Sequence, residues 1–308
     1  MNQTPTVLVT GAEGLLGRHI VRALVDTDTC QVTAVSRMAV WPATKCLTWV
    51  NADLRQASEV QEMASLKADV IIHAAAMLPR TLDDAAAAEA NHAMDDHMLL
   101  LARQSGASLI YMSSLSVYED CDTPWDESLA VHPVAAYAAS KHQSERAIQA
   151  LGLPAATLRI SSPYSASDIT RPGVLYHFAR EAVAGRPLIV TGKGERAQDF
   201  VHGADIGRAV VAVLQHWREH AAGARAETFN IAAGHPISMT ELAELVVSCC
   251  GSGDLVHDGV EDGPPYRAEL SVARAKEILR WQPQVELRAG LEQLIRHMRG
   301  SHEDWLAI

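Results

Sequence analysis

Short apolar runs alternate along the first half of the chain with longer stretches in which apolar residues recur at helical spacing. The helical stretches are Gly14–Val25, Ala86–Gln104 and Ala135–Leu151, and each follows a run rich in apolar and β-branched residues. This alternation predicts an α/β fold, a Rossmann-type doubly wound parallel sheet with right-handed crossovers and helices on both faces. The predicted strands are Thr6–Thr10, Gln31–Ser36, Asp69–His73, Ser108–Met112 and Ala155–Ile160.

The regular alternation weakens after the last of these strands. Residues 161–171 are rich in Ser and Pro, which is typical of a loop that leaves the sheet. We therefore expect a dinucleotide-binding domain over residues 1–162, to which residues 199–233 return. Residues 163–198 and 234–308 are expected to form a smaller, largely C-terminal substrate-binding lobe.

Length, charge and cysteine content narrow the class of protein. A chain of 308 residues is long enough for such a domain and a second lobe. The formal net charge of -11 argues against a nucleic-acid partner, which would need a basic face. The sequence has no apolar run of membrane-spanning length and no secretion signal, so we expect a cytoplasmic protein that does not bind membranes. The five cysteines lack paired spacing and are interpreted as reduced thiols.

The first predicted strand runs directly into the turn Gly11-Ala-Glu-Gly14-Leu-Leu-Gly17. A strand, a glycine-rich turn and a helix in this order bring backbone N–H groups and a helix N-terminus up to a pyrophosphate. Side chains at the glycine positions would block that approach. The pattern favours a dinucleotide site over an ordinary tight turn, with the cofactor contacted by Gly11, Gly14, Leu15, Leu16 and Gly17.

A tyrosine and a lysine stand four residues apart, at Tyr137 and Lys141, near the start of the third helical stretch. Residues with this spacing share one face of a helix. A positive charge beside a phenol favours the phenolate, which suits the phenol to proton exchange with a hydroxyl or carbonyl oxygen. Together with the glycine-rich turn, the pair indicates an oxidoreductase. His216 and His220 share a helix face too, but they lack a third ligand, so no metal site is expected.

Further motifs follow these two in a fixed order. They are Asp53-Leu54, His73-Ala-Ala-Ala76, Asn91, Met112-Ser-Ser-Leu-Ser-Val-Tyr118, Leu158-Arg159, Asp199-Phe-Val-His202 with Asp205, and Trp281-Gln-Pro283. With these motifs the chain resembles the extended short-chain dehydrogenases/reductases over nearly its whole length. That family comprises NAD(P)-dependent epimerases, dehydratases and reductases, and many of its members modify nucleotide-linked sugars.

The resemblance implies a catalytic set of Ser114, Tyr137 and Lys141. Tyr137 would move the proton on the substrate oxygen and Lys141 would also bind the ribose, while Ser113 and Ser116 remain alternatives to Ser114. Leu115-Ser116 replace the Asp-Glu pair of the sugar 4,6-dehydratases, which argues against dehydration. The other cofactor-binding residues that the resemblance implies are Asp53, Leu54, His73, Ala74, Ala75, Ala76 and Asn91.

Cofactor choice depends on the end of the second predicted strand. NAD enzymes usually carry an acidic residue there, roughly 20 residues past the glycine-rich turn, to bind the ribose 2′-hydroxyl. This chain has Ser36 and Arg37 instead. A serine can donate a hydrogen bond to a 2′-phosphate and an arginine can pair with it bidentately. We therefore expect NADP and a net reduction, with NAD as the alternative because an arginine can also stack on adenine.

The substrate positions depart from the family pattern. Ser162 replaces a usual Asn and Gln198 a usual Arg, and both positions serve the nucleotide diphosphate in the family. We expect hydride transfer at a keto or hydroxyl carbon of a sugar-like small molecule. The alternatives are a nucleotide-sugar 4-epimerase with retained NAD and a non-catalytic NADP-binding regulator. The expected substrate-binding residues are Ser114, Ser162, Arg171, Arg196, Gln198 and Arg267.

The resemblance also implies a homodimer. Relatives pair through two helices that correspond to Ala86–Gln104 and Ala135–Leu151. The first of these carries more apolar residues than one sheet face requires, which indicates a second buried surface. Those residues are Met94, Met98, Leu99 and Leu101.

Overall fold

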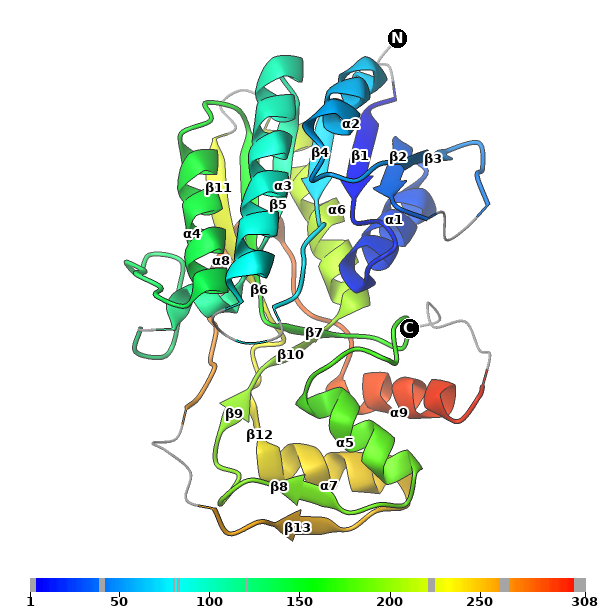
Figure 1. Cartoon of the computed structure of the whole chain (residues 1–308), viewed down its shortest axis with the longest axis vertical. Coiled ribbons are helices and arrows are strands. Elements are labelled where there is room, and N and C mark those ends of the chain that lie inside the picture. Colours follow the sequence, from blue (N-terminus) through cyan, green and yellow to red (C-terminus); the bar gives the residue numbers. More distant parts are fainter. Residues whose placement is uncertain are drawn as a thin grey trace.

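The chain forms a larger lobe built on one sheet and a smaller lobe below it (Figure 1). In the larger lobe, seven strands pair in parallel in the order β11-β6-β5-β4-β1-β2-β3. The strands are β1 (Thr6–Thr10), β2 (Gln31–Ser36), β3 (Leu47–Asn51), β4 (Val70–His73), β5 (Ser108–Ser114), β6 (Ala155–Ile160) and β11 (Ala226–Ile231). The computed structural model describes residues 4–38, 42–79, 81, 84–119, 121–220, 225–260 and 266–301.

The predicted α/β fold is confirmed. Strands β1, β2 and β6 have the predicted bounds, β4 begins one residue later and β5 ends two residues later. Strand β3 was not predicted. It lies at the edge of the sheet, so only Leu47 is buried and the rest of the strand is partly or fully exposed. An edge strand of this kind lacks the continuous apolar run that identifies the inner strands.

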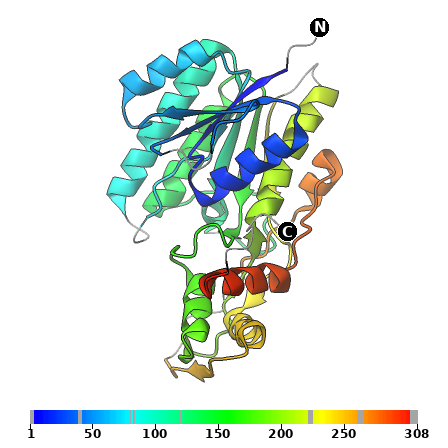
Figure 2. The ribbon, with the colours of Figure 1, turned by 90° about the vertical axis from the view of Figure 1, so that its right-hand side faces the viewer.

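Helices cover both faces of the sheet (Figure 2). Helices α1 and α6 pack on one face, and α3 and α4 lie on the other. The contact between α1 and α6 is close, because a Cβ atom at Gly207 would lie 2.6 Å from the carbonyl oxygen of His19. The helices of this lobe are α1 (Leu15–Thr27), α2 (Ala57–Glu62), η1 (Met63–Leu66), α3 (Ala85–Ser105), η2 (Leu115–Tyr118), α4 (Ala136–Gln149), α6 (Gly203–Glu219) and α8 (Ala273–Leu279).

The smaller lobe has its own apolar core between three helices and short strand pairs. Strands β7 and β10 pair in parallel where the chain passes between the lobes, and β9 pairs with β12, β8 with β13. Residues 261–265 and 302–308 of the predicted substrate lobe lie outside the described residues. The elements are β7 (Ser162–Tyr164), α5 (Val174–Val183), β8 (Leu188–Val190), β9 (Ala197–Gln198), β10 (Phe200–His202), β12 (Ile237–Ser238), α7 (Met239–Cys250), β13 (Leu255–His257) and α9 (Leu287–Met298).

Asp205, in the first turn of α6, fastens a late segment of the chain to the larger lobe. Its carboxylate accepts hydrogen bonds from the backbone N–H groups of Gln284 and Val285, at 2.7 and 3.1 Å. The indole N–H of Trp281 donates to the Asp205 carbonyl oxygen at 3.0 Å. The family motif at Trp281 and the acid of α6 therefore form one structural anchor between the end of α8 and the start of α9.

A buried histidine lies where α6 begins, between the two lobes. His202 Nδ1 accepts a hydrogen bond from the backbone N–H of Ala204 at 3.2 Å and so caps α6. Its ring is in edge contact with those of His19 and Tyr164. Burial, and then the positive charge of Arg208, lower the pKa of His202 to about 4. The folded protein therefore holds this ring neutral at mildly acidic pH.

This titration predicts acid sensitivity. The unfolded chain binds a proton at His202 near pH 6.5 and the folded chain near pH 4, so stability falls as the pH drops between these values. His202→Asn keeps a capping oxygen but does not titrate. Between pH 7 and pH 5 we expect wild-type protein to lose about 2 kcal/mol more unfolding free energy than the variant, measured by urea denaturation. Equal losses would contradict the assignment.

Candidate active site

A cleft of about 760 Å³ opens at the carboxyl ends of the strands, next to the point where the strand order reverses between β1 and β4. Ligands of α/β sheets bind at such a reversal. A second hollow, of about 870 Å³, lies between α1, α6 and α8 and contains none of the predicted site residues. The predicted residues that line the first cleft are Gly11, Gly14, Leu15, Leu16, Ser36, Arg37, Asp53, Leu54, Ala74, Ala75, Ala76, Ser114, Tyr137, Lys141, Ser162 and Arg171.

The glycine-rich turn is shaped for close approach of a ligand and of the neighbouring strand. Gly11 has a φ of +64°, and a Cβ atom there would lie 2.6 Å from the backbone of Ala75 at the end of β4. A Cβ atom at Gly17 would lie 2.1 Å from the Gly11 carbonyl oxygen, so Gly17 serves packing of the turn rather than the cleft wall. Gly14 caps α1, whose N-terminus faces the cleft. These features fit a dinucleotide pyrophosphate.

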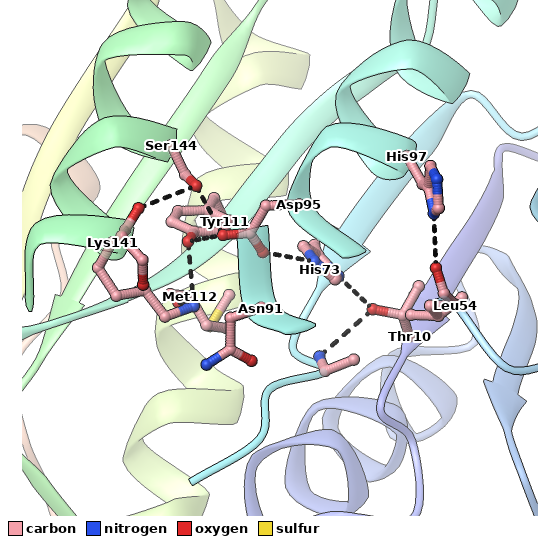
Figure 3. Close-up of polar contacts among 12 residues, drawn as sticks. Thr10, Leu54, His73, Asn91, Asp95, His97, Tyr111, Met112, Lys141 and Ser144 are labelled. Atoms are coloured by element: carbon pink, nitrogen blue, oxygen red, sulfur yellow. Dashed lines mark hydrogen bonds and ion pairs between the residues drawn. The ribbon is translucent and has the colours of Figure 1, made fainter. Parts of the chain in front are cut away.

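Tyr137 and Lys141 both reach the cleft from the first turns of α4. Tyr137 is partly exposed, whereas Lys141 is 2% exposed. The Lys141 ammonium donates hydrogen bonds to the Tyr111 hydroxyl at 3.0 Å and to the Met112 carbonyl oxygen at 3.2 Å (Figure 3). Because an ammonium carries three donors, these contacts leave one for a ligand or for the Tyr137 phenol. These two hydrogen bonds fix the ammonium at the edge of the cleft that Tyr137 also lines.

Serines near the end of β5 have different surroundings. The Ser114 oxygen accepts hydrogen bonds from the backbone N–H and the hydroxyl of Ser116, at 3.2 and 3.1 Å. Both contacts leave the proton of Ser114 to donate to a ligand oxygen. The Ser113 hydroxyl donates to Glu145 at 2.6 Å instead. The geometry therefore favours Ser114 over its two neighbours as the group that meets a substrate oxygen.

A chain of buried polar side chains runs from β1 through β4 to α3 and α4 (Figure 3). His73 contacts the Thr10 hydroxyl through Nδ1 at 2.7 Å and the Asp95 carboxylate through Nε2 at 2.9 Å. Asp95 also accepts hydrogen bonds from the hydroxyl groups of Tyr111 and Ser144, at 2.5 and 2.6 Å. His73 therefore lies under the cleft in this network and is not part of its lining.

The charge of Asp95 follows from these contacts. Burial alone would raise the pKa of this carboxyl, but the Lys141 charge and the hydrogen bonds from His73 and Ser144 hold it well below its usual range. Burial, with the neighbouring Asp95 charge, raises the pKa of Tyr111 well above its usual value. The carboxylate therefore balances the buried ammonium across a neutral Tyr111 phenol. None of the sequence motifs marks Asp95, so this residue was not predicted to belong to the site.

Asn91 and His97 hold the cleft walls from α3. The Asn91 amide accepts from the Met77 backbone N–H at 2.7 Å and donates to the Met77 carbonyl oxygen at 2.9 Å. His97 Nδ1 lies 2.7 Å from the Leu54 carbonyl oxygen. Asn91, predicted to bind the cofactor, therefore positions the loop after β4 and is not itself in the cleft lining. The Asp53 carboxylate, which lines the cleft beside Leu54, pairs with Arg55 at 2.5 Å.

The structure separates the expected substrate-binding arginines. Arg171 lines the cleft together with Asp168. Arg196 and Arg267 are exposed and outside the cleft lining, and Arg267 pairs with Glu269 at 3.0 Å. Gln198 also lies outside the lining, where its amide donates to the Ser162 hydroxyl. Of the three arginines proposed for substrate, the structure brings only Arg171 to the site.

The Leu158-Arg159 motif is structural. The Arg159 guanidinium lies 2.7 Å from the Glu145 carboxylate and 4.7 Å from the centre of the Tyr118 ring, and both charged groups are buried. This pair ties β6 to α4. A charge in this position is stabilised by its partner rather than presented to a ligand.

A glycine-rich turn at the reversal of a parallel sheet, with a tyrosine–lysine pair in the same cleft, defines a dinucleotide-dependent Rossmann-type enzyme. The family model described as "NAD dependent epimerase/dehydratase family" matches residues 7–232. The chain therefore belongs to the NAD dependent epimerase/dehydratase family, which confirms the resemblance. Members of this family are enzymes, so the hypothesis of a non-catalytic regulator is abandoned.

Relatives match the chain over almost its whole length. A putative UDP-glucose 4-epimerase of Methanocaldococcus jannaschii is 25% identical over 96% of this chain and 99% of its own length. A dTDP-4-dehydro-6-deoxy-D-allose reductase of a Streptomyces species is 28% identical over 96% of each chain. The solved structure of the dTDP-glucose 4,6-dehydratase DesIV of Streptomyces venezuelae, with NAD bound, has a TM-score of 0.81 and 25% identity over 96% of this chain and 97% of its own.

No helix in the described ranges is both long and apolar enough to cross a membrane.

Proposed function

We propose that this protein catalyses hydride transfer at a keto or hydroxyl carbon of a sugar-like substrate. One observation carries the proposal: Tyr137, Ser114 and Lys141 line the same cleft as the glycine-rich turn. A bound nicotinamide dinucleotide supplies or accepts the hydride. The chain's own residues hold that cofactor along the turn and move the proton on the substrate oxygen.

Each side chain has a distinct part in the proposed reaction. Tyr137 gives the proton to the substrate oxygen or takes it away, and the Lys141 charge stabilises the phenolate form. Ser114 donates a hydrogen bond to the same oxygen, which stabilises charge that develops there. Arg171 and Asp168 lie at the end of the cleft nearest the smaller lobe and are placed to bind hydroxyl groups of the substrate.

A second candidate is a nucleotide-sugar 4-epimerase that retains NAD and returns the hydride. NADP was expected because of Ser36 and Arg37, and two contacts weigh against it. The Ser36 hydroxyl donates to the Met38 carbonyl oxygen within its own turn, and Arg37 lies 3.4 Å from Glu13. Neither group is therefore preorganised for a 2′-phosphate. NAD in the DesIV structure, together with epimerases among the relatives, supports this candidate.

Two measurements on one preparation distinguish these reactions. Nucleotide released by denaturing purified protein is identified by mass spectrometry, and the protein is then incubated with UDP-glucose, dTDP-glucose or free hexoses. Inversion of the sugar without net change in absorbance at 340 nm supports the epimerase. Stoichiometric oxidation or reduction of added nucleotide supports the oxidoreductase. Protein that binds no dinucleotide under any condition would contradict both.

The cytoplasmic location stays a prediction.

We also propose a homodimer through the outer surfaces of α3 and α4. The apolar-surface argument for it was wrong, because Met94, Met98 and Leu101 are buried against the sheet of their own chain. Leu100, which is 52% exposed, is the large apolar side chain that α3 presents outward. Light scattering at micromolar concentration should give twice the chain mass of 33.3 kDa. Leu100→Glu should give a monomer, and a monomeric wild-type protein would contradict the proposal.

A further inference from the structure

We infer that Glu13 selects the cofactor: its carboxylate binds the 2′-hydroxyl of the adenosine ribose of NAD and repels the 2′-phosphate of NADP. The inference rests on the proposed function only in that the cleft must hold a dinucleotide. Glu13 would then do from the glycine-rich turn what an acidic residue at the end of the second strand does in other NAD enzymes. This chain has Ser36 at that strand end.

The position of Glu13 is fixed by its backbone. It lies between Gly11 and the first residues of α1, and it lines the cleft next to Ser36 and Arg37. The backbone N–H of Ala12 donates to the Val35 carbonyl oxygen at 3.2 Å, which holds the turn against the end of β2. Arg18 donates to the Glu13 carbonyl oxygen at 2.7 Å. The Glu13 side chain therefore projects from a fixed backbone position beside the end of β2, where the ribose of a dinucleotide is expected to bind.

One oxygen of this carboxylate has no hydrogen-bond partner within the described part of the chain. Glu13 Oε1 lies 3.4 Å from the Arg37 guanidinium, a long contact with a side chain that is 70% exposed. Glu13 Oε2 is buried and accepts no hydrogen bond from the described residues. A buried carboxylate oxygen in this state is unfavourable until a donor reaches it. A ribose 2′-hydroxyl in the cleft becomes such a donor when the Glu13 side chain, which is 22% exposed, turns its carboxylate toward it. A phosphate at neutral pH offers mainly acceptors and a like charge.

The surrounding charges favour the same cofactor. The charged residues that line this end of the cleft form two opposite pairs, Glu13 with Arg37 and Asp53 with Arg55. Each cationic side chain among the described residues that line this end of the cleft lies beside an acidic side chain. A 2′-phosphate would add about two negative charges next to Glu13 and would have to take Arg37 from it. NAD brings no such charge.

Binding constants of NAD and NADP test the inference without any assay of turnover. Wild-type protein, freed of copurified nucleotide, should bind NAD at least about tenfold more tightly than NADP by calorimetry. Glu13→Gln keeps the shape but removes the charge, so NADP should bind about tenfold more tightly and NAD a few-fold more weakly. In Glu13→Gln, the Arg37 guanidinium no longer pairs with an acid and is free to bind the 2′-phosphate. The double variant Glu13→Gln with Arg37→Gln should therefore bind NADP less tightly than Glu13→Gln alone.

Two control variants accompany these measurements. Glu13→Asp keeps the charge and should keep discrimination against NADP. Glu62→Gln makes the same charge change at an exposed position outside the cleft and should leave both constants unchanged. Wild-type protein that prefers NADP, or a Glu13→Gln variant with an unchanged ratio of the two constants, overturns the inference while the proposed function stands. Binding of neither nucleotide by any of the proteins overturns both.

Discussion

Replacing Tyr137 by Phe should lower turnover by about 100- to 10,000-fold and leave dinucleotide affinity nearly unchanged. The ring fills the same space in both side chains, so the packing of α4 is preserved. Only the transferable proton and its oxygen are lost. Because the expected reaction moves a proton at the substrate oxygen in the same step as the hydride, the loss appears in kcat.

Controls separate this effect from general damage. Tyr266→Phe also removes a phenol, but from an exposed residue outside the cleft lining, and should retain activity. Lys141→Met should weaken turnover and dinucleotide binding together, because the ammonium is expected to serve both the phenol and the ribose. Wild-type turnover in Tyr137→Phe would exclude Tyr137 as the acid–base group. Calorimetric titration with NAD checks that the variant still binds its cofactor.

Replacing Asp95 by Asn should destabilise the fold by about 3 kcal/mol or more. The carboxylate accepts hydrogen bonds from Tyr111 and Ser144 and balances the charge of Lys141, and both charged side chains are buried. An amide is almost the same size, but it carries no charge and turns one acceptor oxygen into a donor. The buried ammonium is then left without compensation, and this costs more free energy than the pair contributes.

An exposed ion pair on another helix supplies a matched control. Asp26 is exposed on α1 and pairs with Arg22 at 2.7 Å, so Asp26→Asn should change stability by less than about 1 kcal/mol. Urea denaturation of the two variants and of wild-type protein at pH 7 measures the difference. Similar unfolding free energies for Asp95→Asn and Asp26→Asn would mean that Asp95 does not carry the charge assigned to it.

The sequence predicts local and periodic features well. The inner strands, the glycine-rich turn and the Tyr137/Lys141 pair are each defined by residues close together in the chain, and the fold brings them to one cleft. Strand β3 escaped prediction because an edge position removes the burial that makes a strand recognisable. The chemistry of short motifs is thus visible before the structure is known.

Features that depend on contacts between distant side chains were not predictable. The role assigned to Glu13 depends on its contact with Arg37. The role of Asp95 likewise depends on Tyr111 and Lys141, which belong to other elements of the fold. No periodicity in the sequence marks either set of contacts. The direction in which a loop side chain points is equally hidden, so Arg196 was placed in the site although it lies outside the cleft lining. A sequence specifies which charges exist more readily than which of them face one another.

The path of the chain limits how such an enzyme can be recombined. Strand β11, at one end of the sheet, follows the excursion through β7, β8 and β9, and Asp205 then anchors the segment that leads into α9 (Figure 1). The smaller lobe is therefore not formed by one continuous segment of the chain, so exchanging a single segment cannot replace it. A chimera with the lobe of a relative would need compatible junctions at every crossing. Transplanting residues 165–171 between relatives, a segment that follows β7 and carries Asp168 and Arg171 of the proposed substrate site, is the simpler experiment on specificity.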